Sequence, residues 1–495
     1  MNLALVLEMA ASGLGDRTAV VTADRRIDYA ELLDLAGRAA DCFEASDATA
    51  VLYLGTSHAA LPIALFGASI AGIPFVPLNY RLGAKQLDQM VGAHPGAVLV
   101  AEKDAGEWTT LAAVHERGQF LDSLDDRPPR SAPASADPEL PAVLLYTSGT
   151  TAAPKAAILR HRHLVAYLLG TVEFAGAEED EAVLVSVPPY HVAGLANLLS
   201  NIYAGRRIVY LENFDARTWL DTVKSEGVTN AMVVPAMLAR ITEELSGETF
   251  ADTPSLRSLS YGGARMPGPV LERALELFPE VGMVNAYGLT ETSSTIALLG
   301  PDDHREALAS TDPAVRARLS SVGRAVPGIE VEIRHEDGRV LGTGEVGLMF
   351  VRGEQVAGEY AGGSVLDEDG WFPTRDRGHI DADGFMFIEG RADDTIIRGG
   401  ENIASAEIEE EIHAHPEVED VAVVGVADDR WGQRLVAVVV RRGGSTLGES
   451  DLQDWVRDRL RSSKTPDEIR FRDELPRTDT GKLLRRHLVE DASPS

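Results

Sequence analysis

The chain has 495 residues, enough for roughly three domain-sized units, and 44% of them are hydrophobic, as in globular domains with large cores. Its formal net charge of −31 argues against nucleic acid or an anionic membrane surface as the main partner, because lysine and arginine would have to dominate there. A single cysteine, Cys42, excludes an internal disulfide and indicates a reducing compartment.

The N-terminal stretch 1–13 lacks a basic region and carries Glu8 among its apolar residues, so we do not expect a signal peptide. The best candidate for a membrane span is interrupted by His58, Pro62 and Pro74. We therefore expect a cytoplasmic protein without a membrane span.

Residues 1–120 alternate helical and strand patterns. A helix is predicted at 28–45, and short apolar strands are predicted at 48–55 and 96–102, which is typical of βαβ units in a parallel sheet. The stretch 121–142 is rich in Pro, Ser and Asp and is predicted to be a surface connector.

The α/β pattern continues to about residue 300. Strands separated by helices are predicted at 142–147, 182–187, 207–211, 230–234, 256–263 and 282–288. The segment 301–320 is polar, and its helical periodicity is too weak to assign.

Two smaller units follow. Residues 321–390 contain short strands and Gly-rich turns, which indicates a small β-rich subdomain. The last hundred residues carry helix, strand, strand and helix patterns at 405–415, 418–426, 434–442 and 449–460. We predict an α/β protein with a large N-terminal domain at 1–390 and a small C-terminal α+β domain at 391–495.

One segment suggests chemistry directly. In LLYTSGTTAAPKAAILRHRHL, 144–164, an expected strand ends in five hydroxyl side chains around Gly149, followed by Lys155. Such a turn can direct backbone N–H groups, hydroxyls and a cation at a phosphate. It is not a Walker A loop, because Pro154 and Ala156 flank the lysine. On this segment alone, a polar surface turn is an equal alternative.

The motif TSGTTAAPK resembles the phosphate loop of the adenylate-forming superfamily, which includes acyl-CoA synthetases and aryl-CoA ligases. Further segments match that family in the same order: VPLNYRL at 76–82, PPYHVAGL at 188–195, YGGARMP at 261–267, YGLTETS at 287–293, DGWFPTRDRGHID at 369–381, GRADDTIIRGGENI at 390–403 and LPRTDTGKLLRR at 475–486. The ordered set is far more specific than any one segment. The chain is identified as a member of the acyl-CoA synthetase, or fatty-acid–CoA ligase, branch.

The resemblance implies a two-step reaction. A carboxylate, expected to be a fatty acid, joins the α-phosphorus of ATP and expels pyrophosphate. The thiol of coenzyme A then displaces AMP and forms a thioester. The implied cofactors are ATP, Mg²⁺ and, as co-substrate, coenzyme A; the partners are these small molecules, and a homodimer is one option.

The resemblance also assigns the nucleotide site. The β- and γ-phosphates would be held by Thr147, Ser148, Gly149, Thr150, Thr151 and Lys155. Glu291 would bind Mg²⁺, which prefers hard oxygen donors, and Thr290 would bind the α-phosphate. The base would lie against Tyr287 and be framed by Gly262, Gly263, Ala264 and Gly288. The plainer alternative for Tyr287 is an ordinary core aromatic.

Asp376 would accept hydrogen bonds from both ribose hydroxyls, and Arg391 would add a further contact. An ordinary surface ion pair is the alternative for these two. His191, counted with Lys482, Glu291 and Thr290 among the catalytic residues, would gate the acyl pocket or be a structural histidine. The other expected pocket residues are Ala193, Gly194, Ala236, Ala286 and Ser293.

Lys482 is the expected catalytic lysine, because a point charge there can bridge the carboxylate and the α-phosphate in the transition state. The chain has few lysines, at 85, 103, 155, 224, 464 and 482, which weakens the alternative of a chance surface residue. By resemblance, the C-terminal domain is mobile and rotates at Asp393 between the two reactions. Coenzyme A would then pass Gly399, Gly400 and Glu401.

Four positions depart from the family pattern. Ala152 and Ala156 stand where glycine is usual, and we expect strain of about 1 kcal/mol or more if these positions need positive φ. Arg375 also replaces a common glycine, and Ser405 a frequent proline.

Two other functions stay open. The chain could load a carrier protein supplied in trans, or it could be a nucleotide-binding sensor without catalysis. The matches at Glu291, Asp376 and Lys482 argue against the sensor.

Overall fold

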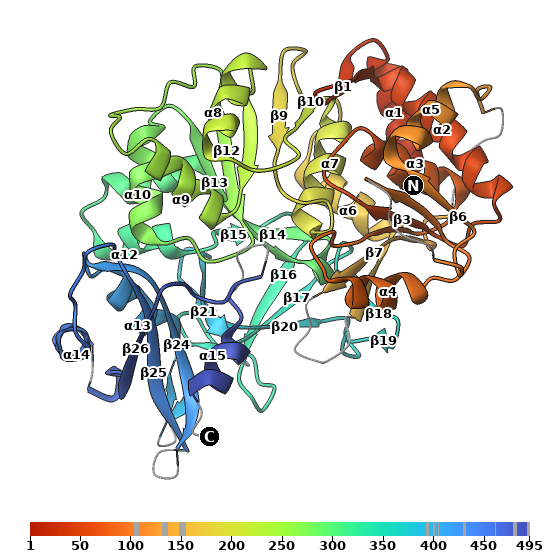
Figure 1. Cartoon of the computed structure of the whole chain (residues 1–495). Coiled ribbons are helices and arrows are strands. Elements are labelled where there is room, and N and C mark those ends of the chain that lie inside the picture. Colours follow the sequence, from red (N-terminus) through yellow and green to blue (C-terminus); the bar gives the residue numbers. More distant parts are fainter. Residues whose placement is uncertain are drawn as a thin grey trace.

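The computed structural model describes residues 1–102, 108–130, 137–147, 155–392, 396–398, 401–403, 405–428, 432–460, 462–478 and 483–492. Figure 1 shows a large N-terminal domain of sheets and helices, coloured red to cyan, and a small α+β domain in blue beside its lower left part. The predicted fold class is confirmed.

The first sheet of the N-terminal domain has a parallel centre. Its strand order is β15 (Arg324–Ala325), β14 (Ser294–Leu299), β13 (Gly282–Leu289), β12 (Ser258–Gly262), β11 (Asn230–Val233), β9 (Ala182–Val185), β10 (Arg207–Tyr210), β1 (Thr18–Val21) and β2 (Arg26–Asp28). Neighbours from β13 to β1 are parallel, and the edge strands β15, β14 and β2 are antiparallel. One face is covered by α8 (Ala216–Ser225), α9 (Pro235–Glu244) and α10 (Gly268–Leu277).

The second sheet is parallel except at one edge. Its order is β19 (Gly363–Ser364), β18 (Glu359–Tyr360), β8 (Lys155–Arg160), β7 (Pro141–Thr147), β4 (Phe75–Pro77), β3 (Val51–Leu54), β5 (Val98–Ala101) and β6 (Ala113–Glu116). Strands β8, β18 and β19 pair antiparallel. Helix α4 (Ala84–Gly92) packs Met90 and Val91 against one face.

A continuous hydrophobic cluster joins the two sheets. The helices that contribute to it are α1 (Leu3–Leu14), α2 (Tyr29–Ala45), α3 (Ala60–Ala71), α5 (Arg117–Asp125), α6 (His161–Thr171) and α7 (Val192–Ala204). The predicted connector at 121–142 is therefore wrong at its start, because α5 buries Phe120, Leu121 and Leu124 in this cluster.

The third sheet belongs to the predicted β-rich subdomain. It is antiparallel, in the order β16 (Glu330–Arg334), β17 (Gly347–Arg352), β20 (Phe372–Ile380) and β21 (Met386–Arg391). The unassigned segment before it forms α11 (Pro301–Ala309), α12 (Pro313–Arg316) and the 3₁₀ turn η2 (Ala317–Ser320). Arg391, the first residue of the predicted C-terminal domain, is the last residue of β21.

The C-terminal domain contains a hairpin of β22 (Ile396–Arg398) and β23 (Glu401–Ile403) and a sheet of β24 (Val418–Asp428), β25 (Gly432–Arg441) and β26 (Glu468–Arg472). Its helices are α13 (Ser405–His413), α14 (Glu449–Arg457) and α15 (Arg485–Ala492), with the 3₁₀ turn η4 (Ser462–Lys464). The helices and strands predicted here from the sequence are confirmed within a few residues at each end.

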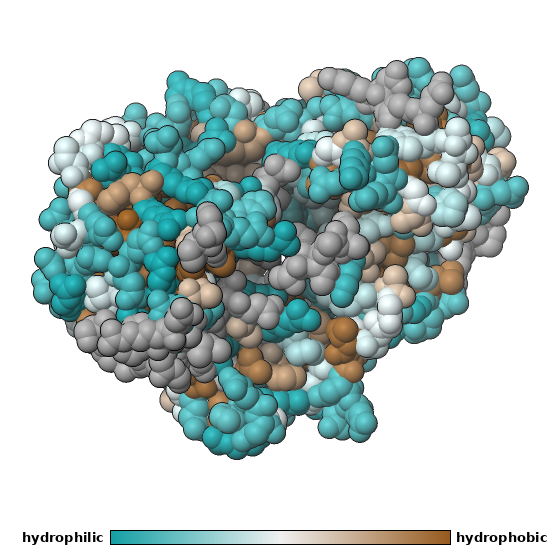
Figure 2. Space-filling model, turned by 60° about the horizontal axis from the view of Figure 1, so that its bottom comes forward, coloured by the Kyte–Doolittle hydropathy of each residue, from teal (hydrophilic) through white to brown (hydrophobic). Residues whose placement is uncertain are grey.

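The surface turned forward in Figure 2 is mostly hydrophilic, and its hydrophobic residues form small patches separated by polar ones. Such scattered apolar surface is ordinary for a folded protein. Among the described residues, no helix combines the length and hydrophobicity needed to cross a membrane.

Candidate active site

The predicted site residues of the first sheet follow the carboxyl ends of its parallel strands. The segment 188–191 follows β9, 234–236 follows β11, 262–264 ends β12, and 287–291 ends β13. In open α/β sheets, ligands bind outside this edge because the strand ends and the loops after them converge there. The fold therefore brings together motifs that are far apart in sequence.

The phosphate loop is only partly within the described residues. Ser148, Gly149, Thr150, Thr151 and Ala152 lie outside them. The flanking residues Thr147 and Lys155 are direct cross-strand partners on β7 and β8. Ala156 lies within β8 opposite Tyr146 and is not among the residues with positive φ, so the strain expected at this alanine is wrong.

Strain occurs instead at Arg375. Its φ of 63° lies in the left-handed region that favours glycine, which is the residue the family pattern has there. Its side chain is exposed. Arg375 therefore has the backbone conformation of the glycine that it replaces, although arginine adopts this conformation less readily.

Three side chains are tied together on facing elements. Arg391 and Asp376 are cross-strand partners on β21 and β20, and Nη1 of Arg391 lies 2.9 Å from Oδ1 of Asp376. The hydroxyl of Tyr287, on β13, donates a hydrogen bond to Oδ2 of the same carboxylate. Burial, followed by the negative charge of Asp376, raises the pKa of Tyr287 well above its ordinary value, so the phenol stays a donor.

This cluster corrects two alternatives left open by the sequence. Tyr287 is not merely a core aromatic, because its hydroxyl joins β13 to the third sheet. Asp376 and Arg391 do form an ion pair, yet the carboxylate side chain is only 6% exposed, unlike an ordinary surface pair. The bond from Tyr287 to Asp376 spans 89 residues, and no local pattern announces it.

Glu291 lies in the 3₁₀ turn η1 (Thr290–Thr292), directly after β13. Its backbone carbonyl accepts hydrogen bonds from the N–H groups of Ala357 and Gly358, at 2.8 and 3.2 Å. Its carboxylate accepts a hydrogen bond from the hydroxyl of Tyr360, on β18. Burial and this hydrogen bond raise the pKa of Tyr360, which keeps the phenol protonated. Sequence reasoning did not single out Tyr360.

The donor set can be tested for fit to magnesium. Within the described ranges, no group of three or more His, Cys, Asp or Glu side chains could hold a metal ion. Mg²⁺ at nucleotide sites commonly uses one or two carboxylates and takes its other ligands from phosphates and water. The half-buried carboxylate of Glu291, with the hydroxyl-bearing Thr290 beside it, fits that mode of binding.

The glycine of the YGLTETS motif is required by packing. A Cβ at Gly288 would lie 1.8 Å from the carbonyl oxygen of Ser294, on the neighbouring strand β14. Gly262 is buried, whereas Gly263 and Ala264 are exposed at the strand edge. The backbone therefore approaches too closely at Gly288 for any side chain.

The residues expected to line an acyl pocket differ in their surroundings. His191 precedes α7, and its ring lies 4.9 Å from that of Tyr190, which packs edge-on against Tyr80 at 5.4 Å. Ala193 and Ala286 are half-buried, and Ala236 is exposed. Ser293 and Gly194, which were also expected there, are buried.

Ser293 is fully buried, and its hydroxyl donates to the carbonyl of Gln355 at 2.8 Å, so it does not line an open pocket. Gly194 is buried in α7, where a Cβ would lie 2.4 Å from the carbonyl oxygen of Pro188. Contacts in the interior explain why these two residues are small. From the sequence alone, this explanation could not be distinguished from a role in lining a pocket.

Several predicted site residues lie outside the described residues. These are Lys482, Asp393, Gly399 and Gly400; Glu401 begins β23, and its side chain is not described. Their roles stay predictions. The C-terminal domain contacts the segment 261–267 through Arg265, whose guanidinium donates to the carbonyl of Ala406 at 3.0 Å and to Glu410 at 2.5 Å on α13.

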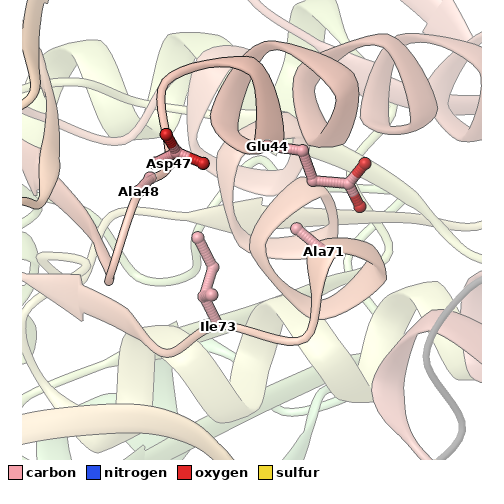
Figure 3. A pocket seen from close by; sticks show the side chains of 5 residues that line it. All are labelled: Glu44, Asp47, Ala48, Ala71 and Ile73. Atoms are coloured by element: carbon pink, nitrogen blue, oxygen red, sulfur yellow. The ribbon is translucent and has the colours of Figure 1, made fainter.

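A hollow lies at the C-terminal ends of α2 and α3. Figure 3 shows Glu44, Asp47, Ala48, Ala71 and Ile73 around it. Its two carboxylates would repel a nucleotide, and it is formed by elements other than the strand ends described above. The strand edge of the first sheet remains the candidate site.

The fold and this edge define an adenylate-forming enzyme. Residues 7–361 match the family model described as AMP-binding enzyme, and residues 407–482 match that of its C-terminal domain. The chain belongs to the AMP-binding enzyme family, and the predicted ATP-dependent, AMP-forming acid–CoA ligase is confirmed at this level, with ATP, Mg²⁺ and coenzyme A as its cofactor and substrates.

Named relatives cover nearly the whole chain. Indoleacetate–CoA ligase of Aromatoleum aromaticum is 33% identical, and the match spans 94% of this chain and 93% of that protein. Feruloyl-CoA synthase of Amycolatopsis sp. is 34% identical, covering 94% of both. Fatty acid–[acyl-carrier-protein] ligase ScoC of Streptomyces coeruleorubidus is 31% identical, covering 95% and 92%.

Solved structures agree with this. ATP-bound MatB from Rhodopseudomonas palustris superposes with a TM-score of 0.87 at 27% identity, covering 99% of both chains. The o-succinylbenzoate CoA synthetase MenE from Bacillus subtilis, in complex with its acyl-adenylate, has a TM-score of 0.84 at 26% identity and covers 98% and 97%.

Proposed function

We propose that this chain is a CoA ligase for an aryl carboxylic acid. Two of the relatives are named for the aryl acids indoleacetate and ferulate. The rings of Tyr80, Tyr190 and His191 pack together, and the half-buried rings of Tyr80 and His191 would supply flat contact area for an aryl group. The fatty acid expected from the sequence is the second candidate, favoured by the small side chains of Ala193 and Ala286 and by the relative named for a fatty acid.

The observation that carries the nucleotide site is the bonding of Asp376. A carboxylate has about four acceptor positions on its two oxygens. Tyr287 and Arg391 each use one of them. The remaining positions accept the two ribose hydroxyls, while Tyr287 is held in place beside the adenine. Gly262, Gly263 and Ala264 frame the base, and Gly288 permits the strand approach that brings Tyr287 there.

The phosphate end uses different residues. Thr147, Ser148, Gly149, Thr150, Thr151 and Lys155 hold the β- and γ-phosphates, and Thr290 holds an α-phosphate oxygen. Glu291 holds Mg²⁺, which when bound neutralises charge that develops on the phosphates during transfer. These residues position two anions for reaction, which is most of what this chemistry needs.

The C-terminal domain completes the proposal. Lys482 brings its ammonium group to the attacking carboxylate and the α-phosphate for adenylation. The domain then rotates at Asp393, so that Gly399, Gly400 and Glu401 border the path of the pantetheine thiol. The single cysteine favours a reducing, cytoplasmic setting.

The test is a competition among acids. Purified protein is incubated with ATP, Mg²⁺, CoA and an equimolar mixture of arylacetic, hydroxycinnamic and medium- to long-chain fatty acids, and thioesters are identified by mass spectrometry. Aryl-CoA products should dominate. Products made only from straight-chain acids would overturn the aryl assignment. Parallel reactions with a phosphopantetheinylated carrier protein in place of CoA show whether the carrier protein or CoA is the better acyl acceptor. This comparison distinguishes a CoA ligase from an enzyme that loads a carrier protein.

A further inference from the structure

Tyr360 lies where two parts of the site meet. It is on β18, and its backbone pairs with Ala157 of β8, the strand that begins at Lys155. Its hydroxyl donates a hydrogen bond to Oε1 of Glu291, which is 69 residues away in the sequence. One residue thus connects the strand of the phosphate loop with the carboxylate that we assign to Mg²⁺.

The segment that carries Tyr360 also holds the backbone around Glu291. Besides the bonds from Ala357 and Gly358 to the carbonyl of Glu291, Gln355 donates from Nε2 to the carbonyls of Thr292 and Thr295, at 3.0 and 2.8 Å. Gln355 is only 3% exposed. The main chain of η1 is therefore fixed from the same segment that contacts the Glu291 side chain.

The segment is itself anchored to β8. Glu359 forms a two-point ion pair with Arg160, with Nε and Nη2 of the arginine at 2.8 and 2.7 Å from the carboxylate oxygens. Such paired contacts fix both distance and orientation. Tyr360 is the next residue, so its ring projects from a strand whose position relative to β8 is well defined.

We propose that Tyr360 is a positioning residue for the metal-binding carboxylate of Glu291. By occupying Oε1, the phenol leaves Oε2 for the cation and fixes the carboxylate relative to β8, the strand that begins at Lys155. Side chains that orient metal ligands in this way commonly change metal affinity by about 10-fold or more when they are removed. The inference rests on the proposed role of Glu291.

The central test compares Tyr360→Phe with the unaltered protein. Pyrophosphate release is measured at saturating ATP and acid over a range of MgCl₂ concentrations. We expect the Mg²⁺ concentration for half-maximal rate to rise about 10-fold in Tyr360→Phe. Tyr167→Phe is the matched control, because it loses a hydroxyl that accepts a hydrogen bond from Ser200 at 3.2 Å, and Tyr167 belongs to the hydrophobic cluster between the two sheets. This control should leave the Mg²⁺ dependence unchanged.

A second readout does not use activity. The melting temperature is recorded with ATP plus MgCl₂ and with ATP plus EDTA. Tyr360→Phe should reduce the extra stabilisation by Mg²⁺ while keeping that by ATP with EDTA and the melting temperature of the ligand-free protein. A lower ligand-free melting temperature with an unchanged Mg²⁺ midpoint would make Tyr360 a purely structural residue and overturn the inference.

Glu291→Gln separates this inference from the proposed function. If Glu291→Gln raises the Mg²⁺ midpoint and Tyr360→Phe does not, only the role of Tyr360 is wrong. If Glu291→Gln itself leaves the midpoint unchanged, the assignment of Glu291 to Mg²⁺ fails, and the role of Tyr360 fails with it.

Discussion

Replacing Asp376 with asparagine tests the nucleotide site most directly. Asparagine keeps the shape of the side chain but removes its charge and turns one oxygen into an NH₂ donor. The amide oxygen can accept from Arg391, whose Nη1 lies 2.9 Å from Oδ1, while the NH₂ group donates to the hydroxyl oxygen of Tyr287. The substitution therefore removes the charge attraction to Arg391 and leaves one acceptor oxygen in place of two.

The expected effect on stability is modest. A hydrogen bond to a charged group contributes about 1.5–3 kcal/mol when it is well shielded from water. The Arg391 side chain is 36% exposed, so water can replace part of the lost interaction, and the guanidinium keeps its bond to the carbonyl of Thr374 at 3.1 Å. We expect a loss of about 1 kcal/mol in the free energy of unfolding.

The expected effect on ATP binding is larger. Two ribose hydroxyls would donate to a neutral amide instead of a carboxylate, and losing about 1 kcal/mol at each weakens ATP binding roughly 30-fold. Calorimetry with ATP and with 2′-deoxy-ATP measures this. The unaltered protein should prefer ATP clearly, and Asp376→Asn should lose most of that preference.

The matched control is Asp302→Asn, because the Asp302 side chain is 99% exposed and, among the described residues, pairs only with Arg305, at 3.0 Å. It should bind both nucleotides as the unaltered protein does. If Asp376→Asn binds ATP within twofold of the unaltered protein and still discriminates against 2′-deoxy-ATP, then Asp376 does not bind the ribose, and the reasoning from its free acceptor positions is refuted.

Two further predictions concern other parts of the chain. Lys482→Ala should abolish acyl-adenylate formation, measured as pyrophosphate release. It should largely spare thioester formation from supplied acyl-AMP and CoA. Intact adenylation would disprove the role of Lys482. Arg375→Gly should raise the free energy of unfolding by up to about 1 kcal/mol, because relief of the left-handed conformation at φ 63° outweighs the added entropy of the unfolded chain. Denaturant unfolding measures this, with Arg339→Gly, an exposed arginine outside that φ region, as control; a destabilised Arg375→Gly would show that side-chain contacts of Arg375 matter more than strain.

The repeating patterns made most of the fold predictable. The strands in the centre of the first sheet are short apolar runs, which is how strands buried on both faces appear in a sequence. The strands β24 and β25 of the C-terminal domain contain longer apolar runs. The polar composition of 121–142 hid the end of α5, because only Phe120, Leu121 and Leu124 mark its buried side. The prediction followed the polar composition and not the spacing of these three apolar residues, and it was therefore wrong.

The site residues that lie within sequence motifs were predictable, whereas those that act only through tertiary contacts were not. Glu291, Asp376 and Arg391 stand in recognisable segments, whereas Tyr360 and Gln355 act through hydrogen bonds to residues about 60 to 70 positions away. Ser293 shows the converse error, since a small polar residue inside a motif proved to be bonded to Gln355 in the interior. Sequence position alone does not tell whether a side chain faces a ligand or the core.

The contacts on either side of the proposed hinge differ in strength in a way that suits rotation. On the N-terminal side, Arg391 lies two residues before Asp393 and is held by Asp376 and by the carbonyl of Thr374. Across the domain boundary, Arg265 binds Glu410 and the carbonyl of Ala406, but the side chains of Arg265 and Glu410 are 46% and 59% exposed. Exposed pairs of this kind contribute only about 0–1 kcal/mol. The rotation that we propose requires a firm pivot and a weak contact between the two domains, because a strong contact would slow the release of the C-terminal domain. Arg265→Ala should therefore change the balance between adenylation and thioester formation more than it changes stability.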